Sequence, residues 1–204
     1  MRNLKGALFF PKSEMSKKDL IETVLLIINK ILDYTSTLNQ ITPTLFDKNY
    51  LVQNKDNDSN ISTSQSSNDE SGCDSNIEKD DQFTLTDYLY LWVEKLEFNS
   101  NLLILTMMNI DKLLSKEFIL TSDNVKNVLF TCMVITQKYY EDENFTDKDY
   151  SKIVRLNPKE LIKMEIEFLS MIDFSLHISD DDFHKYKSNI EDIWRSTLSL
   201  FSFT

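Results

Sequence analysis

Hydrophobic residues recur every three or four positions from residue 83 onwards, with short polar stretches between the periodic segments. This spacing places apolar side chains along one side of a helix, so it predicts a series of amphipathic helices. Residues 83–204 contain no glycine and a single proline. Strands joined by tight turns need more of both, and the pattern therefore predicts an all-α fold.

The segments with this periodicity are each bounded by polar residues. In chain order, the helices are expected at about 18–38, 84–97, 100–116, 121–139, 147–153, 157–172 and from 179 to 198 or beyond. Asn157, followed by Pro158 and then Glu160, predicts a capping box at one helix start. Ser179 predicts a second helix start, with three aspartates placed favourably against the helix dipole. The helix at 100–116 is apolar nearly all round, which predicts a place in the middle of a bundle.

Residues 53–82 differ from the segments on both sides. They include no aromatic residue, eight acidic residues against two lysines, and many Ser and Asn. Such a segment cannot bury enough apolar surface to offset its ordering entropy, which predicts a disordered acidic linker. The predicted organisation is an N-terminal segment with one helix (1–52), this linker, a helical domain (83–178) and a C-terminal helix (179–204).

Charge and composition exclude several classes of protein. The formal net charge is -11 and no dense run of basic residues occurs, which argues against nucleic acid or a membrane surface as a partner. Cys73 and Cys132 have neither metal-ligand nor disulfide spacing, which predicts reduced thiols in a protein of the nucleus, the cytoplasm or both. His177 and His184 lack neighbouring cysteines, and the helical domain lacks a glycine-rich phosphate loop. No metal, cofactor, small-molecule ligand or catalytic site is therefore expected.

Three charged residues lie where their helices are otherwise apolar. Asp111 follows Met107 and Met108 by one turn, Lys138 follows Val134 and Ile135, and Glu165 has apolar neighbours three and four positions away on both sides. Burying such groups unpaired costs several kcal/mol, so each is expected to have a partner or to lie at the edge of an interface. The spacing alone does not decide whether these residues form structural ion pairs or belong to a functional surface.

These residues belong to segments that resemble a known family. The stretch from Phe83 to about Tyr186 resembles the cyclin box, especially that of the short phosphate-pathway and P/U-type cyclins with one box. The segments that carry the resemblance are Asn109-Ile110-Asp111-Lys112, Asn124-Val125-Lys126-Asn127, Thr136-Gln137-Lys138-Tyr139-Tyr140 and Met164-Glu165-Ile166-Glu167-Phe168-Leu169. Two positions depart from the family: Leu91 stands where an arginine often pairs with the aspartate, and Gln137 replaces a small alanine.

The resemblance implies a fold and a function. It implies a five-helix cyclin box with an extra N-terminal and an extra C-terminal helix, and a regulatory subunit, not an enzyme, that activates a cyclin-dependent kinase by docking on its C helix. Lys138 and Glu165 would bind the kinase, Asp111 would be a structural polar residue, and the adjoining apolar docking surface would consist of Ile135, Tyr139, Phe174 and Leu176. A cyclin-fold scaffold or transcription adaptor without kinase activation is the alternative.

Overall fold

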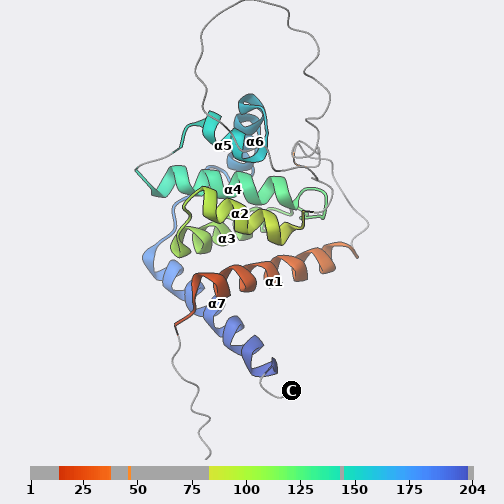
Figure 1. Ribbon diagram of the computed structural model, residues 1–204, viewed down its shortest axis with the longest axis vertical. Coiled ribbons are helices and arrows are strands. Elements are labelled where there is room, and N and C mark those ends of the chain that lie inside the picture. Colours follow the sequence, from red (N-terminus) through yellow and green to blue (C-terminus); the bar gives the residue numbers. More distant parts are fainter. Residues whose placement is uncertain (1–13, 38–45, 47–82, 143–144, 202–204) are drawn as a thin grey trace, which may run out of the picture.

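The computed structural model describes residues 14–37, 46, 83–142 and 145–201. This part of the chain forms seven α-helices and no strand (Figure 1). They are α1 (Lys17–Thr35), α2 (Leu85–Lys95), α3 (Ser100–Leu114), α4 (Val125–Tyr140), α5 (Asp147–Val154), α6 (Pro158–Met171) and α7 (Asp180–Phe201). The predicted all-α fold is confirmed. The predicted linker at 53–82 lies outside the described residues.

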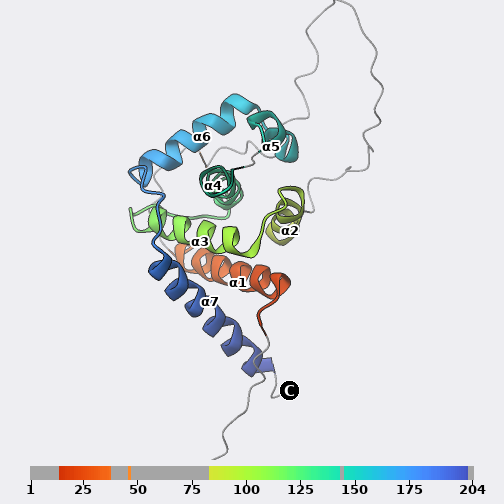
Figure 2. The ribbon, with the colours of Figure 1, turned by 90° about the vertical axis from the view of Figure 1, so that its left-hand side faces the viewer.

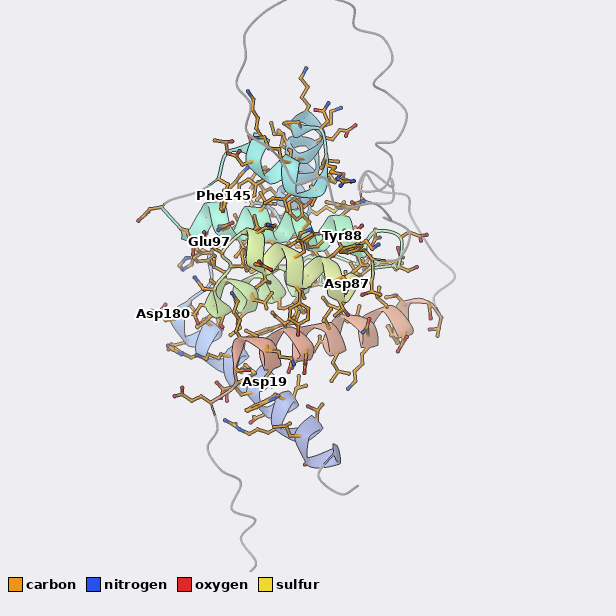
Figure 3. All side chains as sticks on the ribbon, viewed as in Figure 1. Asp19, Asp87, Tyr88, Glu97, Phe145 and Asp180 are labelled. Carbon is orange, nitrogen blue, oxygen red and sulfur yellow. The ribbon has the colours of Figure 1, made fainter. Side chains whose placement is uncertain are left out.

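Several helices begin at a local hydrogen-bonded cap. In the box at the start of α1, the Ser16 hydroxyl accepts from the Asp19 amide at 3.2 Å, and the Asp19 carboxylate accepts from the Ser16 amide at 3.0 Å. Thr84 with Asp87 repeats the arrangement before α2, and Thr146 with Asp149 repeats it before α5. Figure 3 labels Asp19 and Asp87 at these helix starts. Each box satisfies backbone donors that the first helical turn leaves without a partner.

The start of α6 differs in detail from the prediction. Pro158 occupies the first helical position, as expected, but the Asn157 side chain accepts from the backbone amide of Lys159, at 2.9 Å. Glu160 contributes its backbone amide to the Asn157 carbonyl at 2.9 Å. The Asn157 side chain therefore caps α6 by bonding to the backbone amide two residues later, in place of the predicted capping box with Glu160.

Helix α4 lies at the centre of the molecule. Figure 2 looks along α4 and shows α2, α3, α5 and α6 arranged around it. Every residue from Asn127 to Gln137 is buried. Helix α3 packs against α4 on one side and against α1 and α7 on the other, which explains why its apolar residues extend nearly all round.

The buried polar residues of α4 bond to neighbouring segments. Asn127 donates to the backbone carbonyl of Phe46 at 2.8 Å, and Thr136 accepts from the Asn109 side chain of α3 at 3.2 Å. Gln137 donates to the Leu96 carbonyl at the end of α2, at 2.9 Å. A buried polar group stabilises a fold only when it is paired, so these bonds fix α4 in one orientation relative to its neighbours.

Helices α1 and α7 cover the outer side of α3. Leu20, Val24 and Ile28 of α1 are buried, as are Ile190 and Trp194 of α7. The two helices contact each other although they lie at opposite ends of the described chain (Figures 1 and 2). None of the described helices combines the length and the apolar character needed to cross a bilayer.

The burial of Cys132 gives a test of the packing around α4. Its thiol is fully buried and donates to the Thr106 carbonyl of α3 at 3.4 Å. Burial raises the pKa of the Cys132 thiol far above its ordinary value, so little reactive thiolate forms in the folded protein.

In a Cys73→Ser variant, we expect iodoacetamide at pH 8 to alkylate Cys132 at least about a thousand times more slowly in buffer than in urea, because the thiol reacts only when the core opens. Mass spectrometry of timed samples measures both rates, with free cysteine in the same urea solution correcting for the solvent. Similar rates for the folded and unfolded protein would mean that the α3–α4 interface is open to solvent.

Candidate docking site

Three charged side chains meet where α4, α5 and α6 come together. The Lys138 ammonium at the end of α4 donates to both carboxylate oxygens of Glu165 in α6, at 2.8 and 2.9 Å. It also donates to the carboxylate of Asp147, the first residue of α5. The side chains of Lys138 and Glu165 are 28% and 13% exposed, so the pair is partly buried. The structure brings the two predicted residues together and adds Asp147, which was not predicted.

Electrostatics at this cluster reflect both burial and pairing. Burial acts to lower the pKa of Lys138, but the hydrogen bonds and charges of Asp147 and Glu165 together outweigh it, and the net direction is upward. Burial raises the pKa of Glu165, and the hydrogen bonds from Lys138 oppose this without cancelling it. Lys138 is therefore a cation throughout the neutral range, held against two carboxyl groups.

Exposed apolar side chains lie on the segments that carry the charged cluster. Tyr139 follows Lys138 in α4, Ile162 and Ile166 flank Glu165 in α6, and Phe174 follows the end of α6; all four are exposed. We call the surface formed by Lys138, Glu165, Tyr139, Ile162, Ile166 and Phe174 the docking face. Large exposed apolar residues on the helices that hold a partly buried ion pair, and on the segment after them, are typical of a protein interface.

The predicted docking residues divide into two groups. Tyr139 and Phe174 are exposed on the docking face, whereas Ile135 and Leu176 are buried in the core. Ile135 lies one turn before Tyr139 in α4, and Leu176 lies two residues after Phe174. Ile162 and Ile166 were missed, although their positions beside Glu165 on one helix could have indicated them.

The backbone at Phe174 adopts an uncommon conformation. Asp173 and Phe174 have φ angles of 54° and 55°, in the left-handed region that costs a residue with a Cβ about 1–2 kcal/mol. The Lys112 ammonium donates to the carbonyls of the next three residues, Ser175, Leu176 and His177, at 2.8, 3.2 and 3.1 Å. The segment is thereby held in place while the Phe174 side chain remains 65% exposed.

Asp111 finds its partner on α7. Its carboxylate accepts from the Tyr186 hydroxyl at 2.7 Å. Burial raises the pKa of Asp111, and the bond from Tyr186 partly offsets this. The resemblance implied a structural role for Asp111, and Leu91 stands where a pairing arginine is common in the family. In the structure a tyrosine from the last helix makes the contact, which ties α7 to α3.

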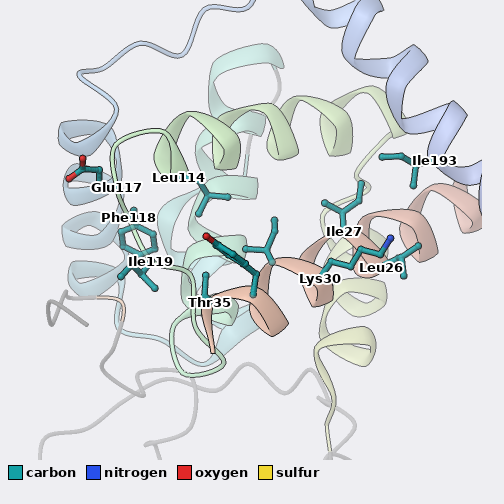
Figure 4. A pocket seen from close by; sticks show the side chains of 11 residues that line it. Leu26, Ile27, Lys30, Thr35, Leu114, Glu117, Phe118, Ile119 and Ile193 are labelled. Atoms are coloured by element: carbon teal, nitrogen blue, oxygen red, sulfur yellow. The ribbon is translucent and has the colours of Figure 1, made fainter. Parts of the chain in front are cut away.

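An apolar pocket of about 660 Å³ lies away from the docking face, between α1, the end of α3 and α7 (Figure 4). Of the described residues that line it, only Lys30 and Glu117 are charged. Within the described ranges, no group of three His, Cys, Asp or Glu side chains is arranged to hold a metal ion.

Comparison with known proteins decides the family. The family model "Cyclin, N-terminal domain" matches residues 49–177, which is more than half of the chain. The chain belongs to the cyclin family. The resemblance inferred from the segments around Asp111, Lys138 and Glu165 is thereby confirmed, and the match includes every helix from α2 to α6.

Curated relatives of this cyclin include plant and yeast proteins. Cyclin-U2-2 of Arabidopsis thaliana is 34% identical over 74 residues, which is 36% of this chain and 32% of the relative. PHO85 cyclin-7 of Saccharomyces cerevisiae is 29% identical over 77 residues, 38% of this chain and 27% of the relative. Cyclin-P2-1 of Oryza sativa is 29% identical over 70 residues, 34% of this chain and 32% of the relative. The matched segment spans about a third of the length of these cyclins or less, and the names agree with the predicted P/U-type and phosphate-pathway likeness.

Proposed function

We propose that this cyclin binds a cyclin-dependent kinase through the docking face and favours the kinase's active arrangement. The observation that carries the proposal is the Lys138–Glu165 ion pair set among exposed apolar residues. The Glu165 carboxylate oxygens can accept further hydrogen bonds from a partner's backbone amides. The Lys138 ammonium, whose three bonds go to Asp147 and Glu165, would exchange one of them for a partner's carbonyl. The apolar residues supply surface that is buried when the partner docks.

The proposed mechanism is a shift between two populations of the kinase. A kinase C helix that packs on Phe174, Ile166 and Tyr139 is held inward, where its glutamate pairs with the lysine that positions ATP phosphates. The cyclin activates only to the extent that it binds this arrangement more tightly than the inactive one. The chain contributes binding energy and no catalytic group, in keeping with a regulatory subunit.

Affinity capture tests the proposal directly. We expect the tagged full chain, captured from its own cells under conditions that preserve complexes, to recover a cyclin-dependent kinase and phosphorylate histone. Mass spectrometry identifies the bound proteins, and mixing the purified kinase with purified cyclin measures activation. A folded chain that captures no such kinase, or binds one without raising its activity, would support the scaffold or adaptor role instead.

A further inference from the structure

A buried glutamine lies directly beneath the charged cluster. Gln137 is 2% exposed and precedes Lys138 in α4. Its side-chain nitrogen donates to the Leu96 carbonyl at 2.9 Å and to the Glu141 carboxylate at 3.2 Å. Both partners are acceptors, so the orientation of the amide is fixed and its oxygen must face the other way.

That oxygen meets Tyr150 of α5. The Tyr150 hydroxyl donates to the Gln137 side-chain oxygen at 3.2 Å, inside the protein. The same tyrosine places its ring below the Lys138 ammonium, with 5.4 Å between the nitrogen and the ring centroid. Tyr150 therefore contacts two successive residues of α4, one through its hydroxyl and one through its ring. A cation at this distance is attracted to the face of an aromatic ring.

The position of Tyr150 also fixes the position of Asp147. The two residues lie one turn apart at the start of α5 and therefore face the same direction. With eight residues, α5 is too short to be stable as an isolated helix, so tertiary contacts must determine where its first turn lies. The bond to Gln137 is one such contact, made on the side of α5 that faces Lys138.

We propose that Gln137 is a positioning residue that holds Lys138 on the docking face through Tyr150 and the first turn of α5. Its amide fixes the Tyr150 hydroxyl, the ring supports the ammonium, and Asp147 binds the ammonium from the side. The consequence for partner binding rests on the proposed function, whereas the positioning of Lys138 is a property of the free chain.

Nuclear magnetic resonance of the lysine ammonium groups tests the positioning without a partner. In the free wild type, we expect slowly exchanging ammonium signals from hydrogen-bonded lysines such as Lys112 and Lys138. The signal that disappears in Lys138→Arg belongs to Lys138. Gln137→Met, which keeps the side-chain length and removes the amide, should lose this protection. Thr136→Val is the matched control, because it removes the neighbouring buried hydrogen bond to Asn109 but none on the Lys138 side, and it should keep the signal.

Tyr150→Phe removes the same hydrogen bond from the other side while keeping the ring, and we expect it to weaken the protection as Gln137→Met does. If a kinase is recovered, Gln137→Met should lower its affinity by roughly 3- to 30-fold, the range for a residue that acts through its neighbours, and Thr136→Val should not. An unchanged Lys138 signal in a folded Gln137→Met protein would overturn the proposal. Failure of the wild type to bind any kinase would instead contradict the proposed function and leave the resonance result to decide the positioning.

Discussion

Replacing Lys138 and Glu165 together with alanine is expected to abolish kinase capture while the helical fold persists. The pair is the polar centre of the docking face, and truncation of such central groups costs about 2 kcal/mol or more, roughly 30-fold in affinity. The double change removes both partners of the ion pair, so it does not leave Glu165 buried without its cation. Binding to the purified kinase, circular dichroism and thermal unfolding provide the measurements.

A matched control exists on the far side of the molecule. Glu191 and Arg195 form an exposed ion pair on α7, with 3.1 Å between the charged groups. Glu191→Ala with Arg195→Ala removes the same number of charges of each sign and should leave kinase binding unchanged. If the Lys138/Glu165 variant unfolds, the pair is needed for stability, and the docking role then depends on the milder Lys138→Met and Glu165→Gln variants losing binding while folded.

Phe174→Gly is expected to weaken kinase binding by about 30-fold or more and, at the same time, to stabilise the free chain. The change removes an exposed aromatic side chain from the docking face. It also relieves a left-handed backbone conformation that glycine adopts without penalty, a gain of about 0.5–1 kcal/mol after the added entropy of the unfolded chain. Opposite effects on affinity and on thermal stability would distinguish a functional residue from a structural one.

The neighbouring residue provides the control for the backbone. Asp173 has nearly the same φ angle, and its exposed ion pair with Lys116 contributes little to stability. Asp173→Gly should therefore raise the thermal midpoint as Phe174→Gly does, but keep kinase affinity. Wild-type affinity in the Phe174→Gly variant would place Phe174 outside the interface and restrict docking to α4 and α6.

The helices could be predicted because their signals are local. Caps such as Asn157-Pro158 and the three- to four-residue periodicity lie within single segments, and the observed bounds differ from the predicted ones by only a few residues. The central place of α4 could not be predicted in this way. Its buried face includes Asn127, Thr136 and Gln137, which look like surface residues until their partners on other helices are known.

The candidate site shows the same division between local and tertiary information. Lys138 and Glu165 stood out because their own helices are apolar around them. Asp147 lies among other acidic residues at a helix start, a position that dipole and capping effects already explain, so nothing local distinguished it. The burial of Ile135 and Leu176, and the contact of Tyr186 with Asp111, depend on how helices cross, which a single sequence pattern does not encode.

The contact between α1 and α7 has a consequence for synthesis of the chain. Helix α1 emerges from the ribosome before α2 to α7, yet α7, which packs against it, is made after the whole cyclin box. Helices α2 to α6 can assemble around α4 as they emerge. Part of the apolar side of α1 stays exposed to solvent until α7 has been synthesised. A chain interrupted before α7 would leave the apolar side of α1 exposed to solvent. Chaperones and proteases bind such exposed apolar surface, so they would act on the interrupted chain and not on one in which α7 has docked.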